Sequence, residues 1–321
     1  MGINFNRRIT WIDTAKGIGI ILVIFGHIGF GRFETWLYSF HMPLFFFLSG
    51  YVYKAKDSYD VFLLKKVRTI LIPYIVFVIL FIFYDFQGKD LGEYFLSMLI
   101  QKRYYHLWFL ACLFLLENLY YPVVMFTRDN DLIIAVITLL FVLIWLMAGK
   151  KILVWNVDAV LYSAPYFAVG YILKKHSLPD FSLKRLVILS PIFLLLNIIF
   201  IVISLRLSGG RLEMFTGEYG SFIFTYIAAF FGIAFTVCMS IIFDNRALRY
   251  IGKNSIVYFG IHPLISLPVA KSILITLNCH DSPGLLGTAY KLAYAALTIV
   301  VTTVISYIYN LIKNTARKNK K

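Results

Sequence analysis

The first residues that could do chemistry are Asp13, Lys16 and His27, which lie in or beside one apolar run. Lys16 and His27 are 11 positions apart, so a helix would carry both side chains on one face, about 16 Å from each other. Asp13 precedes Lys16 by three positions, a spacing at which the two charges can pair. Because imidazole exchanges a proton near neutral pH, this face is typical of general acid–base catalysis. In the packing alternative, Lys16 snorkels to the headgroups and His27 makes a helix contact.

Three further histidines lie in apolar segments, namely His41, His106 and His262. Glu117 follows His106 by 11 positions, so a helix would place its carboxylate on the same face. His106 and Trp108 are also typical of the aromatic belt at a membrane interface. Glu117 has two interpretations, a place in the site and a buried structural pair, because an unpaired carboxylate in lipid is costly.

A second group of residues is suited to binding phosphate. Asn254 and Ser255 stand where a helix would begin, and a helix N-terminus beside Lys253 suits an anion; simple capping is the alternative. Arg68 is singled out from an otherwise ordinary cationic loop, and Ser49 either packs helices or lies close to a ligand. Such groups can hold a phosphorylated cosubstrate by charge and hydrogen bonds.

The elements that position these residues are predicted to be membrane helices. Of 321 residues, 60% are hydrophobic and 15% are charged, which excludes soluble globular, disordered and secreted proteins. A membrane helix needs about 17–25 apolar residues, and we predict an all-α polytopic membrane protein with about ten of them. The predicted spans fall at residues 16–32, 34–54, 68–85, 106–126, 131–150, 151–174, 185–206, 218–244, 253–279 and 291–313. The short apolar stretch 91–100, which contains Glu93, is expected at the interface.

The first predicted span is short for a bilayer. Only 15 uncharged residues separate Lys16 from Arg32, so a helix over them covers about 22 Å of a hydrocarbon core of about 30 Å. A charged residue must therefore lie at membrane depth, or the bilayer must thin there. The candidates for the charged residue are Lys16 and Asp13.

The distribution of positive charge orients the helices. With both termini in the cytoplasm, the inner segments hold 20 Lys and Arg residues and the outer loops hold 8, as the positive-inside rule requires. This orientation places His27, His41 and His106 in the outer half of the membrane. It also accounts for the net charge of +15 without a nucleic-acid partner. The three cysteines are too few and too scattered for a disulfide framework or a metal site.

Five motifs resemble, in this order, the acyltransferase-3 family of integral-membrane O-acyltransferases, especially its fucose 4-O-acetylase-like branch. They are Trp11-Ile-Asp13-Thr-Ala-Lys16-Gly with His27, Phe40-His41-Met-Pro-Leu-Phe-Phe-Phe-Leu-Ser49-Gly50-Tyr, Arg68 with Pro73-Tyr74, His106-Leu-Trp108-Phe-Leu, and Ile251-Gly-Lys-Asn254-Ser255 with His262-Pro263. The resemblance covers most of the chain. It implies ten spans and transfer of an acetyl group from acetyl-CoA to sugar hydroxyls of cell-envelope glycans. The family typically has arginine where this chain has Lys16, and lysine cannot form a bidentate fork with phosphate.

The resemblance implies a catalytic role for Lys16 and His27, and we expect the other candidate residues to act around them. His27 is expected to be the general base or the acyl relay, with Asp13 orienting Lys16. The residues expected to complete the catalytic group are His41 and His106. The residues expected to bind the acyl donor are Lys16, Arg68, Ser49, Asn254 and Ser255. The residues expected to bind the acceptor are Trp108, Glu117 and His262.

We therefore expect a single transmembrane acyltransferase domain over residues 1–321, with no appended soluble domain, in the plasma membrane of a bacterium. Its expected partners are acetyl-CoA, a saccharide or lipid-linked glycan acceptor and membrane lipid, and a homo-oligomer is compatible with the sequence. No metal and no permanently bound cofactor are expected. Two other classes fit the same residues. One is a proton-coupled transporter or flippase of a lipid-linked glycan, with the histidines as a proton relay. The other is a signalling or scaffold protein, whose polar residues only pack helices.

Overall fold

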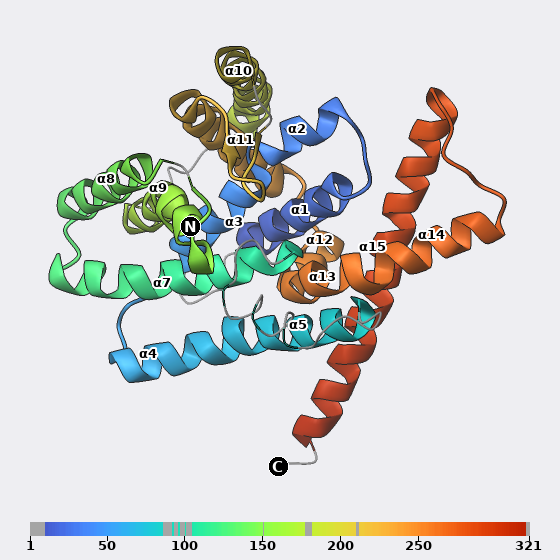
Figure 1. The fold of residues 1–321 in the computed structure, drawn as a ribbon, viewed down its shortest axis with the longest axis horizontal. Coiled ribbons are helices and arrows are strands. Elements are labelled where there is room, and N and C mark those ends of the chain that lie inside the picture. Colours follow the sequence, from blue (N-terminus) through green and yellow to red (C-terminus); the bar gives the residue numbers. More distant parts are fainter. Residues whose placement is uncertain are drawn as a thin grey trace. The chain divides into compact units, whose positions relative to one another are not determined.

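The computed structural model describes residues 10–85, 105–149, 151–176, 182–209 and 212–318, and the single positions 92, 96 and 100. Nearly all of this chain is helical (Figure 1), as expected. One element departs from the all-α expectation: β1 (Leu212–Glu213) pairs antiparallel with β2 (Glu218–Tyr219). Gly217, with φ of +76°, lies in the turn between them, because glycine adopts this backbone conformation without strain. Most of the predicted interfacial stretch 91–100, including Glu93, lies outside the described residues.

Six helical segments among the described residues are long and apolar enough to cross a membrane. They are Tyr59–Tyr84, Tyr105–Phe126, Leu183–Ser208, Phe222–Ile242, Ser255–Thr276 and Leu285–Ala316. The other four predicted spans also contain helices, which are shorter or more polar. These are α1 (Thr10–Gly26), α3 (His41–Val52), α8 (Asp131–Met147) and α9 (Val157–Lys175). The protein is therefore a predominantly α-helical polytopic membrane protein, and the count of ten spans with cytoplasmic termini stays a prediction.

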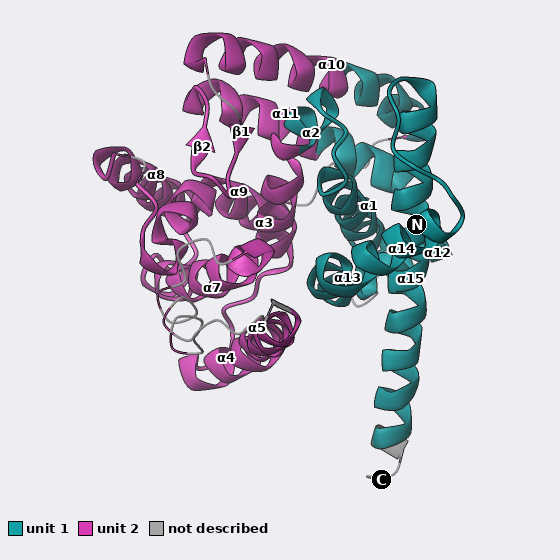
Figure 2. Cartoon of the chain, turned by 45° about the vertical axis from the view of Figure 1, so that its right-hand side comes forward, with its two compact units in different colours: residues 1–37, 183–192, 234–321 teal, residues 38–182, 193–233 magenta. Residues whose placement is uncertain are grey.

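The chain forms two compact units that interleave along the sequence (Figure 2). Unit 1 consists of residues 1–37, 183–192 and 234–321. Its helices are α1, most of α2 (Arg32–Tyr38), the first part of α10 (Leu183–Ser208), the end of α11 (Phe222–Ile242), α12 (Arg246–Lys253), α13 (Ser255–Ile261), the π-helical turn η4 (His262–Ser266), α14 (Leu267–Thr276) and α15 (Leu285–Lys318).

Unit 2 consists of residues 38–182 and 193–233. Its elements are α3, α4 (Tyr59–Lys66), the π-helical turn η1 (Val67–Leu71), α5 (Ile72–Asp85), the short 3₁₀ turns η2 (Tyr105–Leu107) and η3 (Val154–Asn156), α7 (Trp108–Phe126), α8, α9, the hairpin and the remaining parts of α10 and α11. Aromatic rings fill its core, among them the fully buried Trp145, Tyr120 and Tyr162. Burying such large rings is the main source of packing energy in a unit with few charged residues.

In unit 1, α1 and α12 approach so closely that glycine is needed on both helices. A Cβ atom on Gly17 would overlap the carbonyl oxygen of Leu248, and one on Gly252 would overlap the carbonyl oxygen of Asp13. Small residues allow such approach between membrane helices, where van der Waals contact drives association. The crossing fixes the part of α1 that carries Asp13 against α12.

Unit 2 has an equivalent crossing between α3 and α9. A Cβ atom on Gly50 would overlap the carbonyl oxygen of Phe167, and one on Gly170 would overlap that of Phe47. Gly50 is therefore required for helix packing. Its neighbour Ser49 is half-buried beside this crossing, which favours the packing interpretation of the Ser49-Gly50 pair.

Candidate functional site

His27 lies at the end of α1. The helix runs from Thr10 to Gly26, so Lys16 is inside it, whereas His27 occupies the turn that follows. The sequence predicts that one helix carries both residues. This prediction is wrong by one position, because α1 ends at Gly26, directly before His27. The backbone N–H of His27 donates to the carbonyl oxygen of Ile24 at 3.1 Å, and its ring Nδ1 lies 2.8 Å from the carbonyl oxygen of Val23.

His262 packs directly against His27 within unit 1. The ring centroids are 4.9 Å apart and the ring planes cross at 80°. His262 is fully buried as the first residue of η4, and its Nδ1 lies 2.8 Å from the carbonyl oxygen of Tyr258. The sequence predicted that His262 lies in an apolar segment, but it gave no sign of a contact with His27. Only its motif, His262-Pro263, marked it as a site residue.

The backbone fixes the protonation pattern of both rings. A carbonyl oxygen can only accept a hydrogen bond, so Nδ1 of His27 and Nδ1 of His262 must each carry a proton. In the neutral ring the lone pair then resides on Nε2. Two imidazoles with the same tautomer in ring contact form a centre that can accept and pass on a proton.

Two π-helical turns carry residues of the expected site, and each precedes a proline. In η4 the N–H of Leu267 donates to the carbonyl of His262, and in η1 the N–H of Ile72 donates to that of Val67; both bonds span five residues. The next residue is a proline in both cases, Pro268 after η4 and Pro73 after η1. A proline has no backbone N–H, and in an α-helical turn its ring would collide with the carbonyl four residues earlier. Wider turns of this kind are frequent at functional sites.

Asp13 and Lys16 lie one turn apart on α1. Asp13 is buried and Lys16 is half-buried. The Thr14 hydroxyl donates to Asp244 at 2.5 Å, and Asp244 pairs with Arg249 of α12 at 3.1 Å. The N-terminal half of α1 is thus anchored by polar contacts. The pairing of Asp13 with Lys16 stays a prediction.

Asn254 stands at the N-cap position of α13, but its side chain makes no capping hydrogen bond. Its Nδ2 donates to the carbonyl of Tyr250 at 2.8 Å, and its Oδ1 accepts from Asn310 at 2.9 Å. The amide is therefore used to join α12 to α15, which weighs against a role in phosphate binding. Ser255, the first residue of α13, is half-buried.

The site residues of unit 2 that are predicted to lie toward the outer side of the membrane are packed among aromatic rings. His41 is buried, with its ring 5.4 Å from that of Tyr38. His106 is half-buried, 6.4 Å from the ring of Phe81. Trp108 is 4% exposed, so its ring is packed inside the unit and leaves little surface on which a sugar could stack.

Glu117 pairs with Lys66, a partner that sequence reasoning did not assign. Its Oε2 lies 2.6 Å from the Lys66 ammonium, and the two side chains are 6% and 17% exposed. Glu117 therefore forms the buried pair that is one of its two interpretations, and its place in the site stays a prediction. Arg68, by contrast, is exposed on η1, so its guanidinium is available to a ligand.

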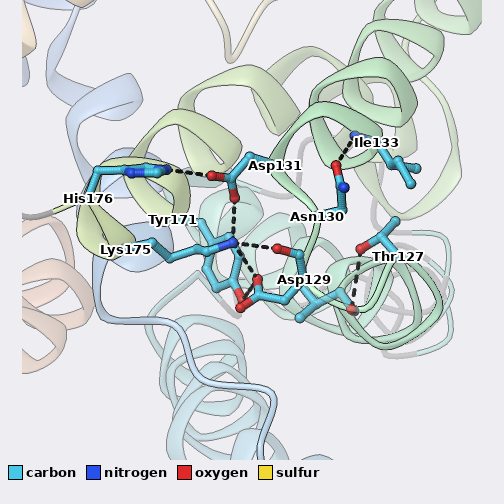
Figure 3. Close-up of polar contacts among 9 residues, drawn as sticks. Thr127, Asp129, Asn130, Asp131, Ile133, Tyr171, Lys175 and His176 are labelled. Atoms are coloured by element: carbon cyan, nitrogen blue, oxygen red, sulfur yellow. Dashed lines mark hydrogen bonds and ion pairs between the residues drawn. The ribbon is translucent and has the colours of Figure 1, made fainter.

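A further polar cluster went unnoticed in the sequence and is drawn in Figure 3. Lys175, at the end of α9, contacts both Asp129 and Asp131. His176 Nε2 lies 2.5 Å from the other oxygen of Asp131, and the Tyr171 hydroxyl donates to Asp129 at 2.6 Å. The hydrogen bond from Lys175, together with that from His176, lowers the pKa of the Asp131 carboxyl although partial burial opposes the shift. The cluster ties the loop before α8 to the end of α9.

The site residues thus fall into two sets. Asp13, Lys16, His27, Asn254, Ser255 and His262 belong to unit 1, and His41, Ser49, Arg68, His106, Trp108 and Glu117 belong to unit 2. Within the described part of the chain, no three His, Cys, Asp or Glu side chains cluster in a way that could hold a metal ion.

Comparison with protein families matches residues 9–311 to the family Acyl_transf_3, described as an acyltransferase domain. The match includes every residue singled out above. Comparison with curated proteins gave no match, and comparison with solved structures gave none either.

Proposed function

Because this chain belongs to the acyltransferase-3 family, we propose that it is a membrane O-acetyltransferase that uses cytoplasmic acetyl-CoA. The proposed acceptor is a hydroxyl of a cell-surface saccharide, of the capsule, O-antigen or exopolysaccharide type, free or lipid-linked. Within the family, the proposed activity is that of the fucose 4-O-acetylase-like branch. The proposed setting is the plasma membrane of a bacterium, with ten spans and both termini in the cytoplasm.

The observation that carries this proposal is the contact between His27 and His262. Acyl transfer to an alcohol needs a base that removes the hydroxyl proton as the new bond forms. His27 is exposed at the end of α1, and its Nδ1 bond to Val23 leaves Nε2 as the basic nitrogen. The buried ring of His262 packs against the His27 ring on its inner side.

The proposed step transfers acetyl directly. The acceptor oxygen bonds to the thioester carbonyl carbon while its proton passes to Nε2 of His27. The carbon–sulfur bond then breaks, and the departing CoA thiolate takes that proton, which leaves a sugar ester and free CoA. General base catalysis of this kind contributes about 10²–10⁴ in rate. A relay in which His27 itself carries the acetyl group is the alternative.

Donor binding is assigned to positive and hydroxyl groups. Arg68 is the leading phosphate ligand in the proposal because it is exposed and can form two parallel hydrogen bonds. Lys16, oriented by Asp13, supplies a second charge, and Ser49 and Ser255 supply hydroxyls. Asn254 is the weakest of these assignments, because its amide already joins two helices.

Acceptor binding is assigned to the outer half of the membrane. His41 and His106 assist proton transfer or hold the acceptor in the proposal. The burial of Trp108 and the ion pair of Glu117 favour supporting roles for those two residues. His262 is assigned to the base rather than to the acceptor, because it touches His27.

The test uses membranes that contain the protein and radiolabelled acetyl-CoA. We expect the wild type to transfer label to a glycan fraction, from which mild alkali releases it. His27→Ala should lose this transfer and still reach the membrane in normal amount. His280→Ala, which removes an exposed loop histidine, is the matched control and should transfer normally. Normal labelling of glycan by His27→Ala would disprove the catalytic role of His27. If the wild type itself produces no labelled glycan, the proposed acetyl transfer is disproved.

A further inference from the structure

An ion pair between Lys66 and Glu117 joins two helices that are long and apolar enough to cross a membrane. The Nζ–Oε2 distance is 2.6 Å, and both side chains are largely buried. Lys66 ends α4, within the span Tyr59–Tyr84, and Glu117 lies in the middle of α7. Ionisable residues at such positions are rare and usually functional, because apolar side chains would pack there without a desolvation penalty.

The surroundings hold the Lys66 ammonium in place. It lies 5.6 Å from the ring centre of Tyr53 and 5.2 Å from that of Phe62, within range of a cation–π interaction. The Tyr53 hydroxyl donates to the backbone carbonyl of Glu117 at 2.8 Å. Lys66 is therefore directed into the unit, whereas its neighbour Lys65 is exposed.

Lys66 directly precedes the π-helical turn that carries Arg68. A π turn has a less regular hydrogen-bond pattern than an α-helix and needs support from its surroundings. Pro73 prevents the α-helical alternative on one side of η1. The bond from Lys66 to Glu117 fixes the other side, two residues from Arg68.

We propose that the Lys66–Glu117 ion pair positions Arg68, so that its guanidinium faces the phosphates of the acyl donor. Lys66 and Glu117 act through Arg68 and do not touch the donor themselves. The inference rests on the proposed function, because it takes Arg68 as the phosphate ligand. In this proposal the two neighbouring cations have different roles: Lys66 pairs with Glu117 inside the unit, and Arg68 binds the ligand.

The experiment measures binding of CoA itself to the purified protein by isothermal titration calorimetry, beside the melting temperature. Glu117→Gln leaves a buried ammonium without its carboxylate and should lower both CoA affinity and melting temperature. The double variant Lys66→Met, Glu117→Gln removes both charges of this pair, so its melting temperature should return to near the wild-type value. Its CoA affinity should stay about tenfold below the wild type, as for loss of a charge-assisted hydrogen bond. Lys56→Met, which removes an exposed lysine, is the charge-matched control and should bind CoA almost normally.

The role of Arg68 is tested by combination. Adding Lys66→Met and Glu117→Gln to Arg68→Gln should not weaken CoA binding beyond Arg68→Gln alone, because the pair acts through that residue. In the transfer assay the double variant should raise KM for acetyl-CoA and leave kcat near the wild-type value. Recovery of CoA affinity together with melting temperature would show that the pair is only structural. Failure of the wild type to bind CoA would instead overturn the proposed donor, and this inference with it.

Discussion

His27 and His262 lie 235 positions apart in the sequence, yet their rings are 4.9 Å apart. Each donates Nδ1–H to the carbonyl four residues earlier, Val23 for one and Tyr258 for the other. The two rings therefore have the same tautomer. They meet edge to face, His27 from the turn after α1 and His262 from η4. In the neutral state, Nε2 is therefore the basic nitrogen of each ring.

The first prediction concerns the dependence of one histidine on the other. His27→Ala should reduce acetyl transfer by about 10²–10⁴, the contribution of a positioned base. His262→Ala should reduce it less, because His27 remains. If the two act as a unit, the double variant should be no slower than His27→Ala alone. Initial rates with labelled acetyl-CoA measure all three. Multiplicative losses in the double variant would indicate independent roles.

The second prediction concerns the π turn that carries His262. Pro268→Ala restores a backbone N–H that can donate to the carbonyl of Leu264, which favours an α-helical turn over η4. Conversion would rotate His262 relative to His27, and a displacement of about 1 Å can reduce the rate by up to about 10²-fold. We expect slower transfer with an unchanged or higher melting temperature. Pro191→Ala restores a helix bond in α10, which carries none of the expected site residues, and should leave the rate unchanged.

Much of the fold could be predicted because lipid imposes simple rules. Backbone groups in a bilayer must be satisfied within a helix, so the apolar runs predicted helical segments, including the short α1 and α3. The exact end of α1 before His27 could not be predicted, because helix ends depend on local capping. The hairpin at residues 212–219 has strands of only two residues, too short for an alternating pattern.

The site was harder to predict than the helices. His27, Lys16 and Asp13 were identifiable from their spacing in or beside one apolar segment, which needs no knowledge of tertiary contacts. The His27–His262 contact and the Lys66–Glu117 pair join distant segments, and helical periodicity does not determine which helices are neighbours. For each π turn the sequence contains one local indication, a proline a few residues after a polar site residue. A proline at such a position is also compatible with a simple helix kink, so it does not by itself predict a π turn.

The third prediction concerns the crossing of α1 and α12. Gly17→Ala would push a methyl group into the backbone of Leu248, and overpacking of this kind costs about 1–3 kcal/mol or more. Gly209→Ala is a suitable control: its Cβ would meet no atom within 4 Å, although its φ of +63° carries some strain. We expect a clearly lower melting temperature in detergent for Gly17→Ala than for Gly209→Ala. Equal melting temperatures for the two variants would mean that α1 and α12 can move apart without loss of stability.

The fourth prediction concerns pH and the cluster around Asp131. Its carboxyl has a lowered pKa in the folded protein, chiefly through the hydrogen bond from Lys175. A lowered folded pKa stabilises the protein above the unfolded pKa of about 3.9, and this stabilisation is lost as pH falls through the folded value. Asp131→Asn should therefore be less stable than the wild type at pH 7, by about 0.2–1 kcal/mol for such a partly exposed pair. The two proteins should converge in melting temperature as pH falls below about 4. Asp57→Asn, in the exposed loop before α4, is the control and should show no such convergence of melting temperatures with the wild type. A melting-temperature difference between Asp131→Asn and the wild type that persists at pH 2.5 would contradict the prediction. It would show that hydrogen bonding to the neutral side chain, not charge, stabilises the cluster.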